Sequence, residues 1–252
     1  LASEKNRLHK VLTDSGIRLG VVVSDLHGQS ARAMVKAIIA GHAPQQVIKL
    51  ASRRLKASRE EILDALQGEL SASHRFVLDE LMRHIEEIEA RISRFDARLL
   101  EGLESERDTL ALMQTIPGID QIGAAMLLVE IGADMDDFGS ADRLASWVGV
   151  CPGNNESAGK RKSGHTRKGN PYVRRLLCEF AHAASRTTSM FKSKFQALVV
   201  RRGYKRAIIA IGHKMLRTLF FMLKRREHYR DCATDYEALS VQRNAPRWIK
   251  AL

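Results

Sequence analysis

The stretch that decides the fold is residues 78–99, LDELMRHIEEIEARISRFDARL. Its apolar residues recur at alternating intervals of three and four, at Leu78, Leu81, Ile85, Ile88, Ile92, Phe95 and Leu99. That spacing lines them up along one side of a helix and is typical of a coiled-coil seam. Between Ser71 and Thr115 there is no proline, and Gly102 is the one glycine, so the pattern predicts a single long helix there.

Two partners for this stripe are open. A sustained heptad needs a helix of similar length beside it, which favours self-association into a homo-oligomer. The alternative is that the stripe packs on other helices of the same chain.

Helical signals dominate the rest of the chain, and the sequence predicts an all-α fold. We expect a helical region over residues 1–70, a coiled coil over 71–110 and a compact helical domain over 111–252. Residues 17–28, IRLGVVVSDLHG, are the β-rich run of the first half, and we interpret them as a loop or an isolated strand.

The composition points to a polyanionic partner. The chain has 252 residues and a formal net charge of +12, and cations that neutralise phosphates release condensed counterions. Nucleic acid is therefore the leading partner, and a membrane surface is the competing one. No uninterrupted apolar run is long enough to span a bilayer, so we expect a soluble protein and no membrane partner. The three cysteines form no CxxC pair, which fits a reducing cytoplasm.

A basic, glycine-rich stretch follows Ser157. From Ser157 to Leu177 there is no acidic residue, and we expect the polar residues there to bind nucleic acid through its phosphates. These residues are Lys160, Arg161, Lys162, His165, Arg167, Lys168, Asn170, Arg174 and Arg175. Asn170 and Pro171 also predict the start of a helix. Taken by itself, a serine in such a loop more often contacts phosphate than attacks it.

Residues 116–120, IPGID, join two apolar helical stretches and resemble the turn of a helix-hairpin-helix motif. In such a turn Gly118 would let backbone amides approach a DNA phosphate. The alternative is plain packing of two helices. The acidic residues nearby, Glu130, Asp134, Asp136 and Asp137, suggest either a metal site or a solvated turn, and we favour the turn.

Three segments together carry a family resemblance. They are residues 116–132, residues 138–184, which include ASWVGVCPGNNESAGKRKSGHTRKGNPYVRRLL, and residues 201–223. In this order they resemble the C-terminal transposase domain of bacterial DEDD-type insertion-sequence recombinases, the one-hundred-and-ten family, whose better-studied members are guided by a bridge RNA. The similarity continues upstream through residues 6–41 and the coiled coil.

The resemblance implies a two-part active site. An N-terminal RuvC-like domain would bind divalent metal, expected to be Mg, and the transposase domain would supply a serine that attacks a DNA phosphodiester. The S-x-G-K segment of the family matches residues 157–160, which makes Ser157 the candidate catalytic nucleophile. The RuvC-like half would precede Leu1, so we expect no metal site or other cofactor in this chain and no strand transfer by it alone.

The function that the resemblance implies is DNA recombination in transposition, in the bacterial cytoplasm, with DNA and a guide RNA as partners. The alternative is a non-catalytic DNA-structure-binding protein that uses the hairpin motif.

Overall fold

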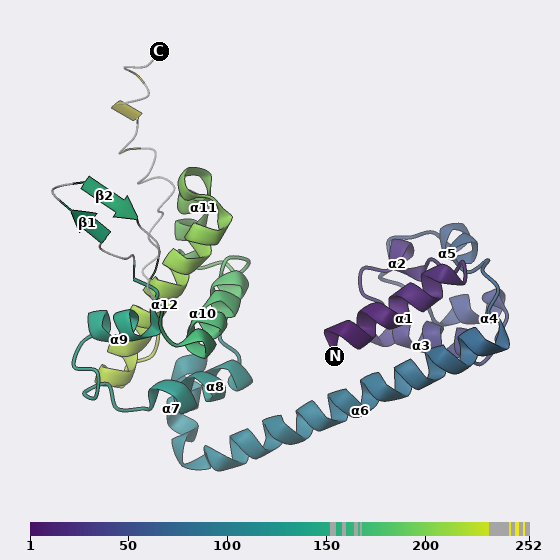
Figure 1. Ribbon diagram of the computed structural model, residues 1–252, viewed down its shortest axis with the longest axis horizontal. Coiled ribbons are helices and arrows are strands. Elements are labelled where there is room, and N and C mark those ends of the chain that lie inside the picture. The colour runs from purple at the N-terminus through teal and green to yellow at the C-terminus, as the bar shows by residue number, and fades with distance from the viewer. Residues whose placement is uncertain are drawn as a thin grey trace. The chain divides into compact units, whose positions relative to one another are not determined.

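The computed structural model describes residues 1–151, 155–157, 160–163, 166, 168–231, 242, 245, 246 and 249. Helices dominate it, which confirms the all-α prediction (Figure 1). Among the described residues the one sheet has two strands. None of the described helices is both long enough and apolar enough to cross a membrane. The chain divides into two compact units, residues 1–96 and residues 97–252.

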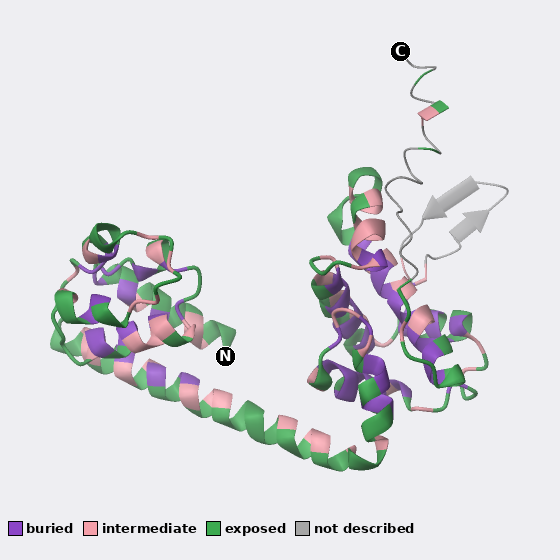
Figure 2. Ribbon diagram, turned by 180° about the vertical axis from the view of Figure 1, so that it is seen from behind, coloured by how far each residue is buried: buried purple, intermediate pink, exposed green. Residues whose placement is uncertain are grey.

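Unit 1 is built from short helices around the first part of a long one. Its elements are α1 (Ala2–Asp14), α2 (Leu19–Val22), α3 (Gln29–Ile39), α4 (Pro44–Val47), the 3₁₀ turn η1 (Ile48–Leu50), α5 (Arg59–Ala65) and the beginning of α6 (Ala72–Gly102). Leu8, Met34 and Leu78 are completely buried at its centre. Figure 2 marks the buried residues of these helices in purple.

The β-rich run at residues 17–28 contains α2, a single helical turn, where a loop or strand was expected. Leu19 and Val23 are four residues apart and both buried, and the Val23 amide donates to the Leu19 carbonyl at 3.0 Å. One helical turn brings both side chains to the same face. Burial of this pair outweighs the strand preference of the valines.

The apolar stripe of α6 serves two different surroundings. Leu78 and Ile85 are fully buried in the core of unit 1, together with Met82. Further along, Ile92 is 42% exposed and Phe95 is 71% exposed. The first half of the stripe therefore packs on helices of its own chain, as the alternative interpretation held. A coiled-coil seam over the second half stays a prediction.

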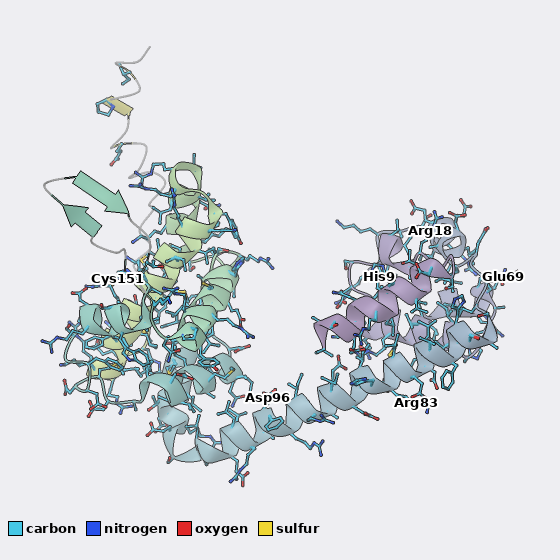
Figure 3. All side chains as sticks on the ribbon, in the orientation of Figure 1. His9, Arg18, Glu69, Arg83, Asp96 and Cys151 are labelled. Atoms are coloured by element: carbon cyan, nitrogen blue, oxygen red, sulfur yellow. The ribbon has the colours of Figure 1, made fainter. Side chains whose placement is uncertain are left out.

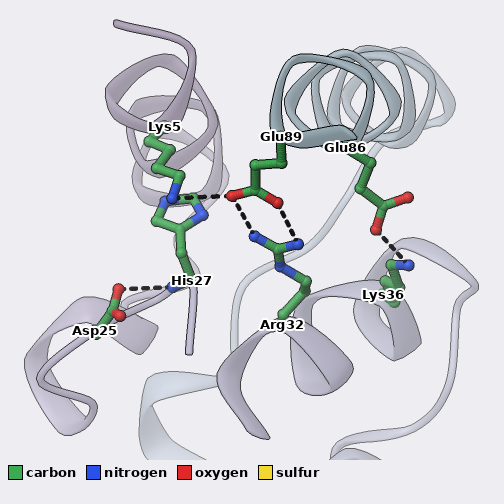
Figure 4. A network of polar contacts seen from close by, with 7 residues as sticks. All are labelled: Lys5, Asp25, His27, Arg32, Lys36, Glu86 and Glu89. Atoms are coloured by element: carbon green, nitrogen blue, oxygen red, sulfur yellow. Dashed lines mark hydrogen bonds and ion pairs between the residues drawn. The ribbon is translucent and has the colours of Figure 1, made fainter. Parts of the chain in front are cut away.

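Polar contacts fix α6 on the other helices of unit 1 (Figure 4). Arg32 on α3 makes two hydrogen bonds to the Glu89 carboxylate, at 2.7 and 2.9 Å, and Lys5 on α1 lies 3.1 Å from the same group. The Arg32 hydrogen bonds lower the pKa of Glu89 to about 2, although partial burial opposes them. Lys36 pairs with Glu86 at 2.6 Å. Burial lowers the pKa of the neighbouring His27.

The long helix ends at Gly102, not near Thr115 as predicted. A 3₁₀ turn, η2 (Glu104–Glu106), follows, and α7 (Arg107–Gln114) begins directly after it. Leu99, Leu100 and Leu103 pack against the core of unit 2. Glycine weakens a helix, and these leucines gain burial where the chain turns at its end.

Unit 2 is a helical domain arranged around α12 (Tyr204–Arg225), against which α7, α9, α10 and α11 pack. Its other elements are α8 (Gln121–Ile131), α9 (Ala141–Val148), β1 (Asn155–Ser157), β2 (Lys160–Ser163), α10 (Pro171–Ala184) and α11 (Met190–Arg202). A Cβ on Gly212 of α12 would lie 3.2 Å from the Leu177 carbonyl oxygen of α10. The glycine thus lets these two helices approach closely.

Candidate nucleic-acid interface

The basic stretch leaves the core of unit 2 at the end of α9 and returns to it at the start of α10. Gly149 caps α9 with a left-handed backbone, φ +75°, and Cys151 follows it (Figure 3). A Cβ on Gly169 would overlap the Val148 carbonyl and lie 2.5 Å from the Gly149 amide nitrogen. The chain segments before and after the loop therefore touch at Gly169, where only glycine fits. We call this contact, with the side chains that support it, the loop base.

Asn170 closes the loop base with both ends of its side-chain amide. Its Oδ1 accepts hydrogen bonds from the Tyr172 and Val173 amides at 2.9 and 3.1 Å, which confirms the predicted helix cap. Its Nδ2 donates to Glu130 Oε2 of α8 at 2.7 Å. The Asn170 backbone amide donates to the Trp147 carbonyl at 3.3 Å. Asn170 therefore joins α8, α9 and α10, and contact with nucleic acid stays a prediction for it.

Arg174 also supports the loop base. From the first turns of α10 its guanidinium donates to the Gly149 carbonyl on the outgoing side and, at 3.2 Å, to Thr166 Oγ1 on the returning side. The bonds are part-buried, and hydrogen bonds from a charged donor are the stronger class. We predicted a phosphate ligand at this position, and the structure places Arg174 between the two ends of the loop.

Arg175, the next residue, lies in a different environment. Its side chain is 78% exposed, and its Nε pairs with Glu179 Oε1 at 3.0 Å, one helical turn further along α10. Lys168 is also exposed and has no ion pair within the described ranges. An exposed i,i+4 pair is weak and can exchange its carboxylate for a phosphate. Both cations are thus available to a nucleic acid beside the loop base.

Ser157 lies at the end of a β-hairpin that the sequence did not predict. β1 and β2 pair antiparallel, with Ser157 opposite Lys160, Glu156 opposite Arg161 and a register shift next to Asn155. The two-residue connection 158–159 between two short polar runs was the available signal. Backbone pairing alone is described for Ser157, Lys160, Arg161 and Lys162, whereas His165 and Arg167 lie outside the described residues.

The turn at Gly118 packs inside unit 2. Its backbone has φ +94°, and an added Cβ would lie 2.6 Å from the Phe180 carbonyl oxygen and 2.7 Å from the Ala184 nitrogen of α10. At the start of α8 the Asp120 carboxylate already accepts the Gly123 amide at 2.7 Å. A carboxylate there repels a phosphate. These contacts favour the packing interpretation of the hairpin, and DNA contact by Gly118 stays a prediction.

Three of the four nearby acidic residues act as partners of other groups. Glu130 accepts from Asn170, Asp136 pairs with Lys224 at 2.7 Å, and Asp134 Oδ1 accepts the Asp136 amide at 2.8 Å. In the part of the chain that the structure describes, no three His, Cys, Asp or Glu residues are grouped as metal ligands. We therefore assign no metal-dependent step to these carboxylates.

Further cations lie on α11 and α12. Lys194 is half-buried, and burial, reinforced by the charge of Lys214, lowers its pKa. Lys224 pairs with Asp136, and Arg226 donates to Thr109 Oγ1 at 2.8 Å. Four others are exposed and have no ion pair among the described residues: Arg201, Arg202, Lys205 and Arg206. These four add positive charge to the surface of unit 2.

Comparison with known proteins gives this geometry a family context. Residues 110–196 match the model of the transposase IS116/IS110/IS902 family, and this range contains the hairpin and the loop base. The chain is 26% identical over 190 residues to a probable family 20 transposase of Pseudomonas aeruginosa, which covers 72% of this chain and 56% of that protein.

Two other relatives agree. The transposase for insertion sequence element IS1111A of Coxiella burnetii is 28% identical over 136 residues, 52% of this chain and 37% of that protein. The 42 kDa protein of insertion element IS900 of Mycobacterium paratuberculosis is 28% identical over 166 residues, 64% and 41% of the two chains. This chain spans about half the length, or less, of these relatives. The similarities thus lie with transposases and with proteins of insertion elements.

Proposed function

We propose that this chain is the part of a DNA transposase that supplies the attacking hydroxyl, and that Ser157 is the nucleophile. The observation that carries the proposal is the family match over residues 110–196, because this range contains Ser157, the hairpin and the loop base. The loop base fixes where the segment leaves and re-enters the core. A nucleophile requires such fixed surroundings to meet its substrate in a reactive geometry.

In the proposed step a bond forms between Ser157 Oγ and a DNA phosphorus, and the bond from that phosphorus to one deoxyribose oxygen breaks. The leaving oxygen takes up a proton, and the serine hydroxyl gives one up. A serine hydroxyl is a weak nucleophile, so a nearby group must activate it. Lys160, Arg161 and His165 are the candidates, and Lys160 is the ladder partner of Ser157. The positive charge of Lys160 and Arg161 would also stabilise the transition state.

Exposed cations would hold the DNA backbone beside this step. Lys168 and Arg175 are the described candidates next to the loop base, and phosphate contacts of this kind position DNA without reading bases. Arg174 is instead a positioning residue, since its hydrogen bonds join Gly149 and Thr166. In this proposal Lys168 and Arg175 bind DNA phosphates, whereas Arg174 holds the two ends of the loop in position.

The resemblance supplies the remaining elements of the proposal. Divalent metal would be held by acidic residues of a RuvC-like domain, a guide RNA would choose the sites, and chains would associate through the exposed second half of the α6 stripe. The non-catalytic alternative depends on phosphate contact at the Gly118 turn. That turn packs on α10, so the contacts weigh against it.

The test compares two serines of the same hairpin in the chain extended by the RuvC-like domain. Ser157→Ala should abolish the denaturant-resistant protein–DNA adduct and leave DNA affinity nearly unchanged. Ser163→Ala, on β2, is the matched control and should keep the adduct. An adduct that survives Ser157→Ala would refute the assignment of the nucleophile.

A further inference from the structure

A second basic surface lies in unit 1, outside the range that the family model matches. Residues 49–59, KLASRRLKASR, contain five cations and no acidic residue. The rest of residues 1–96 has ten Lys and Arg against thirteen Asp and Glu. We call residues 49–59 the basic segment. The positive charge of this segment is a local feature, because the rest of unit 1 carries a net negative charge.

None of the cations of the basic segment has a carboxylate partner among the described residues, whereas five of the ten other Lys and Arg residues of unit 1 have one. Around α6, Lys5 and Arg32 share Glu89 and Lys36 pairs with Glu86 (Figure 4). Arg7 and Arg83 pair with acids on their own helices. Five exposed side chains have no ion pair within the described part of the chain: Lys49, Arg53, Arg54, Lys56 and Arg59.

The backbone of the basic segment is held in place by side-chain hydrogen bonds. Ser30 at the start of α3 donates from Oγ to the Leu50 carbonyl at 2.8 Å and accepts the Ser52 amide at 2.8 Å. At the other end Ser58 and Glu61 form a capping box, with the Ser58 amide 2.7 Å from Glu61 Oε2. The cations therefore extend from an ordered backbone, and binding there costs little backbone entropy.

We propose that the basic segment is a second nucleic-acid contact and binds the sugar-phosphate backbone of DNA or RNA. Three of its five cations are arginines, whose planar forks match phosphate oxygens. A hollow of about 740 Å³ beside it is lined by Arg18 and Lys56 and also by Glu61 and Asp64 of α5. Arg18 is labelled in Figure 3.

A nucleic acid fits this surface better than a membrane does. Membrane-surface segments insert bulky apolar side chains beside their cations. Leu50 is the one exposed large apolar residue of the basic segment, at 43%, and Leu55 packs against the core of unit 1. Five cations with one exposed large apolar side chain among them match a polyanion that is bound along its backbone.

The experiment uses the full chain and two triple variants with the same change in charge. Arg53→Gln, Arg54→Gln and Lys56→Gln are combined in the test variant. The control combines Arg7→Gln, Lys36→Gln and Arg83→Gln, which remove cations that are already paired. Fluorescence anisotropy measures binding to duplex DNA, duplex RNA and single-stranded RNA of one sequence across a range of KCl concentrations. Thermal unfolding checks that both variants fold.

For at least one of these nucleic acids, the test variant should bind more weakly, and its slope of log affinity against log salt should be shallower by about two to three units. The control should keep the slope of the unmodified chain. Loss on DNA alone or on RNA alone would support the proposal and name the nucleic acid. Equal slopes for test and control on all three nucleic acids would overturn it.

The proposed contact at the basic segment can be refuted while the proposed function is upheld. A separate variant, Lys168→Gln with Arg175→Gln, alters the charge beside the loop base of unit 2. If that variant weakens DNA binding and the unit 1 test variant matches its control, the contact in unit 1 is refuted alone. If only the unit 1 variant weakens binding, phosphate binding beside the loop base is refuted.

Discussion

Replacing Arg174 and Arg175 one at a time by glutamine separates anchoring of the loop from binding of phosphate. The two residues are adjacent on α10, and each substitution removes one positive charge. Arg174→Gln breaks the hydrogen bonds to the Gly149 carbonyl and to Thr166 Oγ1. Bonds from a charged donor contribute about 1.5–3 kcal/mol each, and glutamine can replace part of that, so we expect a loss of about 2–4 kcal/mol in unfolding free energy.

For a domain of this size each kcal/mol shifts the melting temperature by about 2–4 °C, so Arg174→Gln should melt roughly 4–16 °C lower. Its salt slope for duplex DNA should not change. Arg175→Gln loses an exposed pair worth less than about 0.5 kcal/mol, so its melting temperature should hold. Its salt slope should instead fall by about 0.9, the contribution of one phosphate contact.

Calorimetry and a salt titration by fluorescence anisotropy measure the two quantities. The roles that we assign would be refuted if Arg174→Gln lowered the salt slope and left the melting temperature unchanged. Loss of binding to one base sequence alone, in either variant, would contradict a role in contacting phosphate.

Three further predictions address the fold and assembly. Gly118→Ala should lower the free energy of unfolding in urea by about 2 kcal/mol or more, since the new methyl group meets the backbone of α10 and the left-handed φ is strained. The control Gly102→Ala should be near neutral, because its Cβ would contact nothing. Equal effects would contradict the packing of the turn. The pKa of Glu89 is lowered from 4.5 to about 2, so its contribution to folding stability is complete above pH 4.5 and disappears as the pH falls towards 2. Glu89→Gln should therefore destabilise the protein by roughly 1–2 kcal/mol at neutral pH. A difference in stability between variant and unmodified chain that did not close in acid would refute this linkage. Ile92→Lys and Phe95→Lys should dissociate any oligomer in light scattering and leave unit 1 folded by circular dichroism. Ile85→Lys should instead unfold unit 1, because Ile85 is fully buried. An oligomer of unchanged mass would show that the exposed stripe is not the seam.

Features set by local chemistry could be predicted from the sequence. Asn170 and Pro171 begin a helix as expected, since a cap depends on a few neighbouring residues. The partner of the α6 stripe could not be predicted, because the same periodicity serves an internal core at Ile85 and an exposed surface at Phe95.

The candidate site divides in the same way. The sequence located the basic stretch and its serine, since residue type and charge are sufficient for that. It could not separate Arg174 from Arg175, because their difference depends on the fold bringing Gly149 next to α10. The hairpin was missed because its strands have three and four residues and lack alternating apolar side chains.

The close contact at Gly169 has a consequence for how this region can change. Because the Val148 carbonyl lies against Gly169, the segment between them begins and ends at one point of the core. The distance that it must span stays the same whatever its length, and closure entropy rises only slowly with added residues. The segment between Cys151 and Thr166 should therefore be replaceable by segments of different lengths from related proteins. Selection can then alter the chemistry of this insert while the helices that fold unit 2 keep their sequence.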